Sequence, residues 1–372
     1  MNPVGCTPSA PATKVVALLC LLTTLGILFS TLWPFNPFPP NHVSWLVETN
    51  GIRVGRRGVV LSEGALRSSS SASGDEPCTL ELWIKPAHTD SVSTVLDFYE
   101  PGNPWRFLLR QYLTGLIVSH DVPVLADRPR RIQLDVDDGL RQNQLTFITI
   151  TSGRNGTRVY FDAKPKRTFP HFQISSDDLS GQLVLGSSTV TSDPWSGEVH
   201  GLAIYPRELN SEEVLQSYQR WTEGAVAASD LDSITFTFAE RGGNIVRDQG
   251  ALHRDLAIPV TYRVPHHSFL TPPWREFEAT VDYLWDVLRN IAGFLPFGFL
   301  VCAWFRRSKR TSHPVLFTTL LGCALSLGIE ILQAYIPQRE SGLSDVITNT
   351  LGTALGAVLV PSWIGRKLLP RG

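Results

Sequence analysis

Residues 314–364 read PVLFTTLLGCALSLGIEILQAYIPQRESGLSDVITNTLGTALGAVLVPSWI, and this stretch decides the fold of the C-terminal part of the chain. It contains two apolar spans, 315–336 and 346–364, each long enough to cross a bilayer, with a short polar loop between them. Glu330 lies within the first span. A mid-helix charge costs about 2.5–3.5 kcal/mol on an insertion scale, so such a residue is usually functional or paired.

Polar residues recur at helical spacing on three apolar spans. Residues separated by three or four positions share one face of a helix, so each span is predicted to present one polar stripe. Glu330 lies six residues before Ile336, which places it about 9 Å below the outer surface at 1.5 Å per residue, and Asn290 and Asn349 lie at a similar depth. The sequence therefore predicts a site open to the outer leaflet. The three sets are Ser326, Glu330 and Gln333; Asp345, Asn349, Gly352 and Gly356; and Asp286, Asn290 and Gly293.

Two interpretations of these polar residues stay open. Glu330 either fixes the bundle through hydrogen bonds or acts as a proton-exchanging or headgroup-recognising group. Arg339 is either a surface anchor or a phosphate ligand, because its planar guanidinium suits bidentate contacts. Asp345 is predicted to be the N-cap of the last helix, with a role in the site following from that position. The remaining small or kinking residues, Gly293, Pro296, Gly298, Gly352 and Gly356, are assigned to helix packing.

The composition and motifs of the chain argue against several classes of function. The chain has 372 residues and a formal net charge of −1, so no global field favours nucleic acid. It has no Cys/His zinc spacing and no glycine-rich phosphate loop, so neither a metal nor a cofactor is predicted. No nucleophile–base pair is recognisable, and no catalytic residue is assigned. Cys78 is the only cysteine between residues 34 and 282, so this segment has no internal disulfide.

Four membrane spans are expected, at 15–33, 283–305, 315–336 and 346–364. The first is interpreted as an uncleaved anchor rather than a signal peptide, because it is longer than a typical signal core and TLWPFNPFPP offers no small-residue cleavage site. The basic loop RRSKR (306–310) and the tail residues Arg366, Lys367 and Arg371 should be cytoplasmic. Both termini, 1–14 and 365–372, are then cytoplasmic, and residues 34–282 lie outside the cytoplasmic membrane of a bacterium.

The segment between the first two spans reads as an all-β domain. A proline-rich stem (34–49) precedes many short strand-like runs separated by Gly, Pro, Asp and Ser, which predict an antiparallel jelly-roll sandwich over 50–222. Asn155-Gly156 indicates a hairpin turn. SEEVLQSYQRW (211–221) predicts a helix with Asn210 as N-cap and Glu213 at N3. Residues 223–282 are expected to be a linker with extra strands and a juxtamembrane segment.

The membrane part resembles the VanZ-like family. The resemblance rests on RNIAGFLPFGFLV (289–301), on SLGIEILQAYIPQRESGLSDVITNTLGTALG (326–356), and on a first helix that ends in a Trp-Pro stem. That family is named for a protein linked to resistance to the glycopeptide teicoplanin. The resemblance implies a role in glycopeptide resistance or in exopolysaccharide or cell-wall metabolism, without naming a reaction.

The middle part resembles laminin G-like, concanavalin A-type jelly rolls over about residues 50–222. CTLELWIKPA (78–87), GTRVYFDA (156–163) and WSGEVHGLAIYPRELNSEEV (195–214) carry the resemblance. It implies a two-sheet sandwich that binds carbohydrate or protein. Ala163 stands where that family often has glycine after aspartate, so a copied loop geometry, and with it a calcium site, is not implied.

Three tryptophans are candidates for stacking against a sugar ring: Trp83, Trp105 and Trp195. Strand alternation puts Leu80, Leu82 and Ile84 on one face and Trp83 on the other, where it either stacks a sugar or packs against the fold.

The leading hypothesis is a binding and accessory protein of the bacterial envelope. Its partners would be a lipid or lipid-linked envelope precursor in the bundle and a glycan or envelope protein at the sandwich. The precursor site is assigned to Asn290, Glu330, Gln333, Arg339, Asp345 and Asn349. An intramembrane enzyme or proton-coupled lipid transporter that uses Glu330, and a purely structural assembly factor, are the alternatives.

Overall fold

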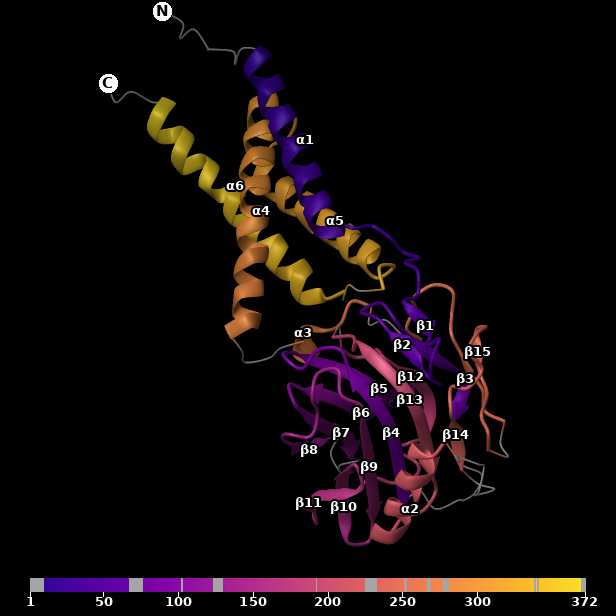
Figure 1. The fold of residues 1–372 in the computed structure, drawn as a ribbon. Coiled ribbons are helices and arrows are strands. Elements are labelled where there is room, and N and C mark those ends of the chain that lie inside the picture. Colours follow the sequence, from indigo (N-terminus) through magenta and orange to yellow (C-terminus); the bar gives the residue numbers. More distant parts are fainter. Residues whose placement is uncertain are drawn as a thin grey trace, which may run out of the picture. The chain divides into compact units, whose positions relative to one another are not determined.

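The computed structural model describes residues 10–66, 76–101, 103–122, 130–191, 193–224, 233–250, 253–265, 269–276, 281–337, 339 and 341–368 (Figure 1). The chain divides into two compact units. One combines Met1–Pro37 with His267–Gly372, and the other is Phe38–His266. The first is helical and the second is a β-sandwich, so both predicted fold classes are confirmed.

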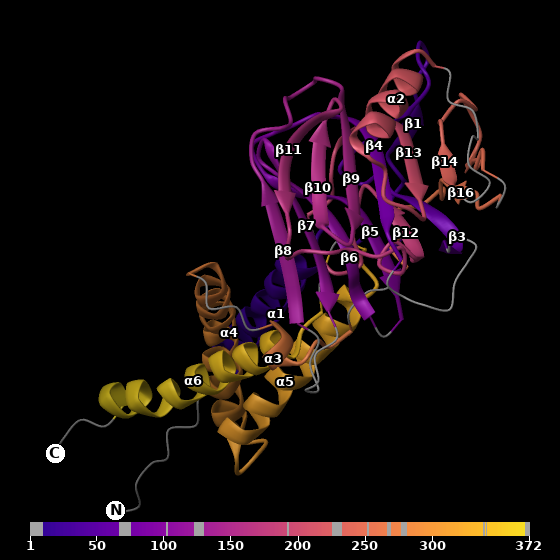
Figure 2. The ribbon, with the colours of Figure 1, turned by 90° about the horizontal axis from the view of Figure 1, so that it is seen from below.

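The sandwich is built from two antiparallel eight-stranded sheets (Figures 1 and 2). The first sheet has the order β1-β2-β13-β4-β9-β10-β11, with β14 paired to β13, and the second has the order β15-β16-β3-β12-β5-β6-β7-β8. The strands of the first sheet are β1 (Val43–Trp45), β2 (Ile52–Val54), β4 (Cys78–Pro86), β9 (Thr146–Gly153), β10 (Gly156–Phe161), β11 (Lys164–Phe169), β13 (Gly197–Tyr205) and β14 (Ile234–Phe236). Those of the second are β3 (Val60–Leu66), β5 (Val92–Glu100), β6 (Asn103–Tyr112), β7 (Gly115–Val122), β8 (Arg130–Val136), β12 (Gly181–Leu185), β15 (Ile245–Val246) and β16 (Leu256–Ala257).

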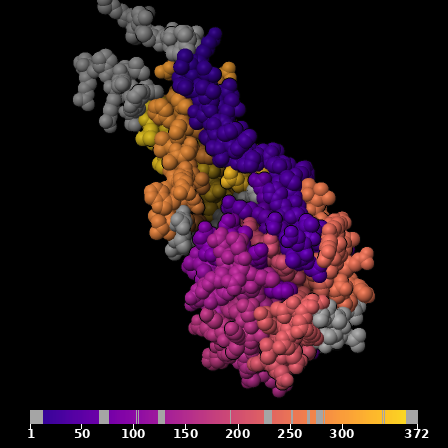
Figure 3. All heavy atoms as spheres, viewed as in Figure 1, coloured from indigo at the N-terminus to yellow at the C-terminus, as the bar shows by residue number. Residues whose placement is uncertain are grey.

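Strand alternation divides β4 between two hydrophobic clusters, as its sequence predicts. Leu80, Leu82 and Ile84 belong to the main core. Glu81 and Trp83 point to the opposite face, which helix α2 (Ser211–Thr222) covers through Val214 and Trp221. In the space-filling view of Figure 3, the salmon-coloured segment that includes α2 forms part of the surface of the sandwich. The helix begins with the predicted capping box, in which the Asn210 side chain accepts from the Glu213 N–H and the Glu213 carboxylate accepts from the Asn210 N–H.

The predicted hairpin at Asn155-Gly156 joins β9 to β10, with Gly153 opposite Gly156. Gly156 has φ +92°, and a Cβ there would press on the carbonyl oxygen of Phe169, so the position needs glycine. The loop itself is therefore Arg154-Asn155, one position earlier than the sequence pattern suggests.

The sandwich extends past residue 222, the end predicted from the sequence. Strand β14 pairs with β13 and β16 pairs with β3. Phe236, Phe238, Val246 and Leu256 lie in the main core. The expected linker composition at 225–232 lies outside the described residues. The strand candidates after it belong to the sandwich, because long-range pairing and burial hold them there.

The stem also differs from its prediction, because its second half is part of the sandwich. Val43–Trp45 forms β1 and pairs with β2. The Asn41 amide donates to the carbonyls of Val59 (2.9 Å) and Pro259 (2.8 Å), and its oxygen accepts from the Val59 N–H. These bonds tie the two ends of the unit together.

The helical unit contains α1 (Ala10–Leu32), α3 (Pro273–Glu276), α4 (Val281–Ser308), α5 (Pro314–Gln333) and α6 (Leu343–Leu368). Within the described residues, four helices of this unit have segments long and apolar enough to cross a membrane: Thr13–Leu32, Tyr283–Ser308, Pro314–Gln333 and Leu343–Val360. Ile27 of α1 packs with Phe294, Phe297 and Val301 of α4 and with Ile329 of α5. Figure 1 shows the end of α1, the start of α4, the end of α5 and the start of α6 at the same end of this bundle.

Candidate functional site

Glu330 is 1% exposed in the last turn of α5. After α5 ends at Gln333, the chain folds back, and the backbone N–H of Gly342 donates to Glu330 Oε2 at 2.9 Å. A buried carboxylate needs such hydrogen bonds, since transferring an unpaired charge into an apolar interior is costly. Glu330 therefore holds the turn that connects α5 to α6.

The same turn binds the segment that leads into α4. Thr271 and Gly342 form a parallel bridge. The Thr271 N–H donates to Ser341 O at 3.0 Å, and the Leu343 N–H donates to Thr271 O at 3.0 Å. No sequence pattern predicts this contact, because it is formed by backbone groups alone.

Asn349 joins α6 to α5. Its amide nitrogen donates to Ser326 Oγ at 2.9 Å, and both side chains are buried. The other amide atom, Oδ1, is buried and has no hydrogen-bond partner. Buried polar atoms are rarely left unpaired, so this acceptor in the bundle interior is a candidate ligand contact.

Asn290 and Asp345 join α4 to α6. The Asn290 amide donates to Asp345 Oδ1 at 2.7 Å. The prediction that Asp345 is the N-cap is wrong, because α6 begins at Leu343 and Asp345 lies inside its first turn. The stripe predicted on α4 is only partly inward: Asp286 is exposed and pairs with the exposed Arg289.

Gln333 and Arg339 both bind the C-terminal end of α1. The Gln333 amide donates to Thr31 O at 3.0 Å. The exposed Arg339 guanidinium donates to Trp33 O at 3.3 Å. A helix leaves its last four carbonyls without intrahelical partners, so these donors satisfy part of the α1 terminus.

The residues assigned to helix packing differ in how closely they approach a facing helix. A Cβ on Gly298, Gly352 or Gly356 would press on the backbone of the facing helix at Thr353, Ile291 or Leu295, respectively. Glycine permits this close crossing of α4 and α6. Gly293 and Pro296 lie on the exposed side of α4, and a Cβ on Gly293 would meet nothing within 4 Å.

The six predicted site residues thus lie at one end of the bundle, but in five separate hydrogen-bonded contacts. Glu330, Gln333 and Asn349 are buried, whereas Arg339 is exposed. The set offers carboxylate and amide groups that suit hydroxyls or amides of a ligand. Among the described residues, no three His, Cys, Asp or Glu side chains gather closely enough to hold a metal ion.

The three tryptophan candidates have different surroundings. Trp195 is 1% exposed and its indole N–H donates to Gln111 Oε1 at 2.8 Å, so it is a core residue and cannot stack a sugar. The Arg131 guanidinium lies 3.1 Å from the Trp105 ring centroid and covers one face of that ring. Trp83 is half-buried, edge-on to Trp221 of α2 with ring centroids 6.3 Å apart.

Two buried carboxylates of the sandwich were not singled out from the sequence. Glu81 Oε2 accepts from Ser217 Oγ (2.7 Å), Trp221 Nε1 (3.1 Å) and the Tyr205 hydroxyl (3.2 Å), and so anchors α2. Burial raises the pKa of Glu81, against the lowering effect of these hydrogen bonds. Burial also raises the pKa of Asp97 to about 6, although Ser188 and Thr189 donate to its Oδ2.

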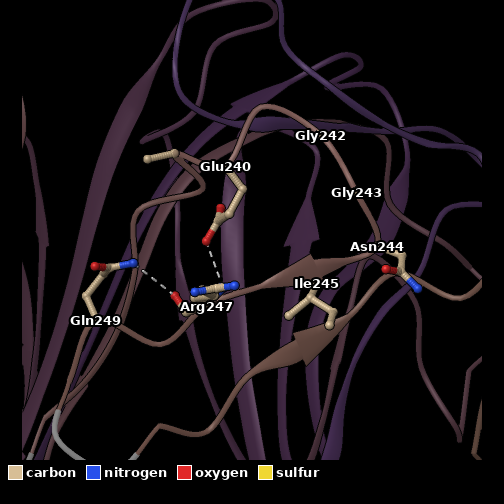
Figure 4. A pocket seen from close by; sticks show the side chains of 8 residues that line it. Glu240, Gly242, Gly243, Asn244, Ile245, Arg247 and Gln249 are labelled. Carbon is tan, nitrogen blue, oxygen red and sulfur yellow. Dashed lines mark hydrogen bonds between the residues drawn. The ribbon is translucent and has the colours of Figure 1, made fainter.

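A shallow surface hollow lies around β15 (Figure 4). Its lining includes Glu240, Gly242, Gly243 and Arg247. Within it, Glu240 accepts from the Arg247 N–H at 2.8 Å, and Gln249 donates to the Arg247 carbonyl at 3.4 Å. Both hydrogen bonds join residues of the same segment, 240–249, and stabilise its turn.

Comparison with known proteins identifies two regions. Residues 233–364 match the family model VanZ/LLP1, and residues 62–215 match the model of the concanavalin A-like lectin/glucanases superfamily. No curated protein matches the chain. The VanZ/LLP1 match begins within the sandwich unit, at the residues that form β14.

Solved structures resemble the chain at low identity. A native heptameric SAP-like pentraxin from Limulus polyphemus is 16% identical over 44% of this chain and 83% of that one, with a TM-score of 0.31. A putative carbohydrate binding protein from Bacteroides ovatus is 12% identical over 54% and 57%, with a TM-score of 0.37. The receptor binding domain of botulinum neurotoxin mosaic serotype C/D is 14% identical over 48% and 44%, with a TM-score of 0.35, so the chain spans less than half of that domain.

The four apolar helices and the VanZ/LLP1 match indicate a membrane protein. The chain therefore combines a VanZ-like membrane region with a concanavalin A-like sandwich inserted between its first and second membrane-type helices.

Proposed function

We propose that this chain is an envelope protein of the bacterial cytoplasmic membrane that binds a lipid or lipid-linked envelope precursor in its helical unit and a glycan at its sandwich. The observation that carries the first part is the buried polar end of the bundle. Glu330 is 1% and Asn349 5% exposed, and Asn349 Oδ1 has no partner. A bundle that needed only apolar packing would not require these groups, whose burial in a membrane helix is costly.

The distribution of positive charge supports one orientation of the protein in the membrane. The last turn of α4 carries Arg306 and Arg307, and Lys309 and Arg310 follow it, which favours a cytoplasmic location for this end of α4. The buried polar end of the bundle then faces outward, with both termini in the cytoplasm. The chain leaves α1 and returns into α4 at this outer end, so residues 34–282 are extracytoplasmic. Reporter fusions after Glu63 and after Arg310 should report opposite compartments; the same compartment for both would refute this orientation.

Lipid binding can be measured on the purified full chain. We expect mass spectrometry to find a co-purifying lipid or lipid-linked precursor in wild type, and Glu330→Gln to reduce its amount at least fivefold. Asp286→Asn is the matched control, because it neutralises an exposed carboxylate of the same bundle. Arg339→Gln should also reduce the bound lipid, and the double variant should bind no less than either single one, because residues of a shared site are not additive.

A structural assembly role is the second candidate, because each predicted site residue bonds to another helix or turn of its own unit. In that case Glu330→Ala would lower the melting temperature or the membrane level, and neither Glu330→Ala nor Glu330→Gln would change the lipid content per folded molecule. Resistance is tested by growth in teicoplanin with wild type or Glu330→Gln expressed at equal levels. Equal growth would remove glycopeptide resistance from the proposal.

A further inference from the structure

A row of charged side chains crosses three strands on the outer face of the first sheet, beyond the reach of α2. Arg53 on β2, Glu198 on β13 and Lys85 on β4 are direct cross-strand neighbours. Glu198 accepts from Arg53 Nη2 at 2.8 Å and pairs with Lys85 Nζ at 3.3 Å. Side chains at paired positions of an antiparallel sheet point to the same face, so the three form one continuous surface.

Two rings border this row. His200 Nε2 lies 3.4 Å from Glu198 Oε2, and the His200 ring centroid lies 5.8 Å from that of Trp83. The register of β13 against β4 shifts between Val199 and Gly201. This irregularity lets His200 share the outer face with Glu198 while Gly201 lies under the Trp221 ring of α2.

The row carries more positive than negative charge. Burial raises the pKa of Glu198, but the hydrogen bonds from Arg53 and Lys85 outweigh it and hold the pKa below its usual value. Burial lowers the pKa of His200, against the raising effect of Glu198, so this imidazole is neutral at pH 7. Two cations therefore face one carboxylate, and the surface complements an anion. Arg53 is the most accessible of the three, with 64% of its side chain exposed.

We propose that Trp83, His200, Glu198, Lys85 and Arg53 form the glycan site of the sandwich and that this site takes an acidic, uronate-type oligosaccharide. A sugar ring presents an apolar C–H face that packs on an aromatic side chain. Glu198 and the neutral imidazole offer hydrogen bonds to hydroxyls, and the guanidinium of Arg53 suits a sugar carboxylate. This inference rests on the proposed glycan-binding function and names its ligand class and location.

The test uses the full chain in nanodiscs of uncharged lipid, with oligogalacturonate as the acidic probe and maltooligosaccharide as the neutral one. We expect oligogalacturonate to bind at least tenfold more tightly than maltooligosaccharide. Arg53→Gln, Lys85→Met and Trp83→Leu should each weaken its binding at least fivefold. Each single charge variant leaves Glu198 one cationic partner, Lys85 or Arg53, so both variants should fold normally. Lys164→Met is the matched control, since Lys164 is an exposed lysine on β11 of the same sheet.

The outcomes separate this inference from the function on which it rests. Wild-type affinity for oligogalacturonate in both charge variants would overturn the site. Equal or tighter binding of maltooligosaccharide would overturn the acidic ligand class while glycan binding stands. Failure to bind any sugar of a broad glycan array would overturn the proposed function itself. Binding of polyglutamate that equals that of oligogalacturonate and is lost in the same variants would assign the surface to an acidic peptide and refute the sugar.

Discussion

Glu330 and Gly342 are separated by 12 residues in sequence, and the Gly342 N–H donates to the Glu330 carboxylate at 2.9 Å. Gly342 also forms a parallel bridge with Thr271, on the segment that leads from the sandwich into α4. Gly342 therefore links the Glu330 carboxylate to the segment that precedes α4. The chain that leaves α1 is held as well: Gln333 donates to the carbonyl of Thr31, and Arg339 donates to the carbonyl of Trp33.

Glu330→Ala should lower the stability of the helical unit. It removes the acceptor of the buried Gly342 N–H, and an unsatisfied buried donor costs about 1–3 kcal/mol. Glu330→Gln keeps an acceptor oxygen at the same place, so it should melt close to wild type. The measurement is thermal unfolding in detergent or nanodiscs. Equal melting of the alanine and glutamine variants would show that this hydrogen bond does not hold the turn.

Gly352→Ala should disrupt the crossing of α4 and α6. An added Cβ would overlap the carbonyl of Ile291, which belongs to a helix backbone and cannot move alone. Overpacking of this kind costs typically about 1–3 kcal/mol, and a rigid backbone neighbour favours the upper end. Reduced membrane level and a lower melting temperature should report the loss.

Gly293→Ala is the control for that substitution. Gly293 lies on α4 as well, but a Cβ there meets nothing within 4 Å. Alanine is also a better helix former than glycine by about 1 kcal/mol, so this variant should be neutral or stabilising. A Gly352→Ala variant as stable as Gly293→Ala would contradict the close crossing.

The sequence was sufficient where the signal is local or repeated. Apolar length located the four membrane-type helices, and Asn210 with Glu213 marked the start of α2 by the spacing of a capping box. Glycine spacing on α6 identified its packing face at Gly352 and Gly356. Each of these features depends on residues within one element, so the residues that determine it lie close together in the sequence.

The sequence was not sufficient where the partner is a distant backbone group. Glu330 binds the N–H of Gly342, and Gln333 binds the carbonyl of Thr31, 302 residues away. Every residue has these backbone groups, so no pattern marks them. Trp195 shows the same limit, because its burial depends on Gln111 and on both sheets rather than on its own neighbours. The end of the sandwich was misplaced for a related reason, since β14 and β16 gain their stability from strands far away in the chain.

The sandwich should fold alone as residues 38–266 and not as residues 42–222. The shorter fragment loses Phe236, Phe238, Val246 and Leu256 from the core. Burial of each side chain contributes about 1.5–3 kcal/mol to the free energy of unfolding. The four contributions together approach the whole free energy of unfolding of a typical domain. It also loses Asn41, whose amide donates hydrogen bonds to the carbonyls of Val59 and Pro259.

Circular dichroism and denaturant titration can compare the two fragments. The longer one should unfold cooperatively, and reductant should not change its midpoint, because Cys78 is its only cysteine. Cooperative unfolding of residues 42–222 with the same midpoint would mean that the strands after residue 222 are dispensable.

Asp97 should make the stability of the 38–266 fragment depend on pH. The carboxyl is buried and has a folded-state pKa of about 6, raised from 3.8. The folded state therefore holds this proton more tightly than the unfolded chain. Its contribution to stability is full below about pH 4 and is lost as pH rises to about 6, and one pKa unit corresponds to about 1.4 kcal/mol, which gives a loss of about 3 kcal/mol.

Asp97→Asn should remove that part of the pH dependence, since an amide does not titrate. In this variant the amide nitrogen would take the place of Oδ1, a buried atom with no hydrogen-bond partner. An unpaired donor there would lower the stability at every pH, so the free energy of unfolding at a single pH is not the readout. The readout is the difference in the free energy of unfolding between pH 4 and pH 7, measured in urea for wild type and variant. Asp137→Asn, at an exposed position of the same domain, should keep the wild-type difference. If Asp97→Asn also keeps it, Asp97 is ionised in the folded domain already at low pH and the raised pKa is wrong.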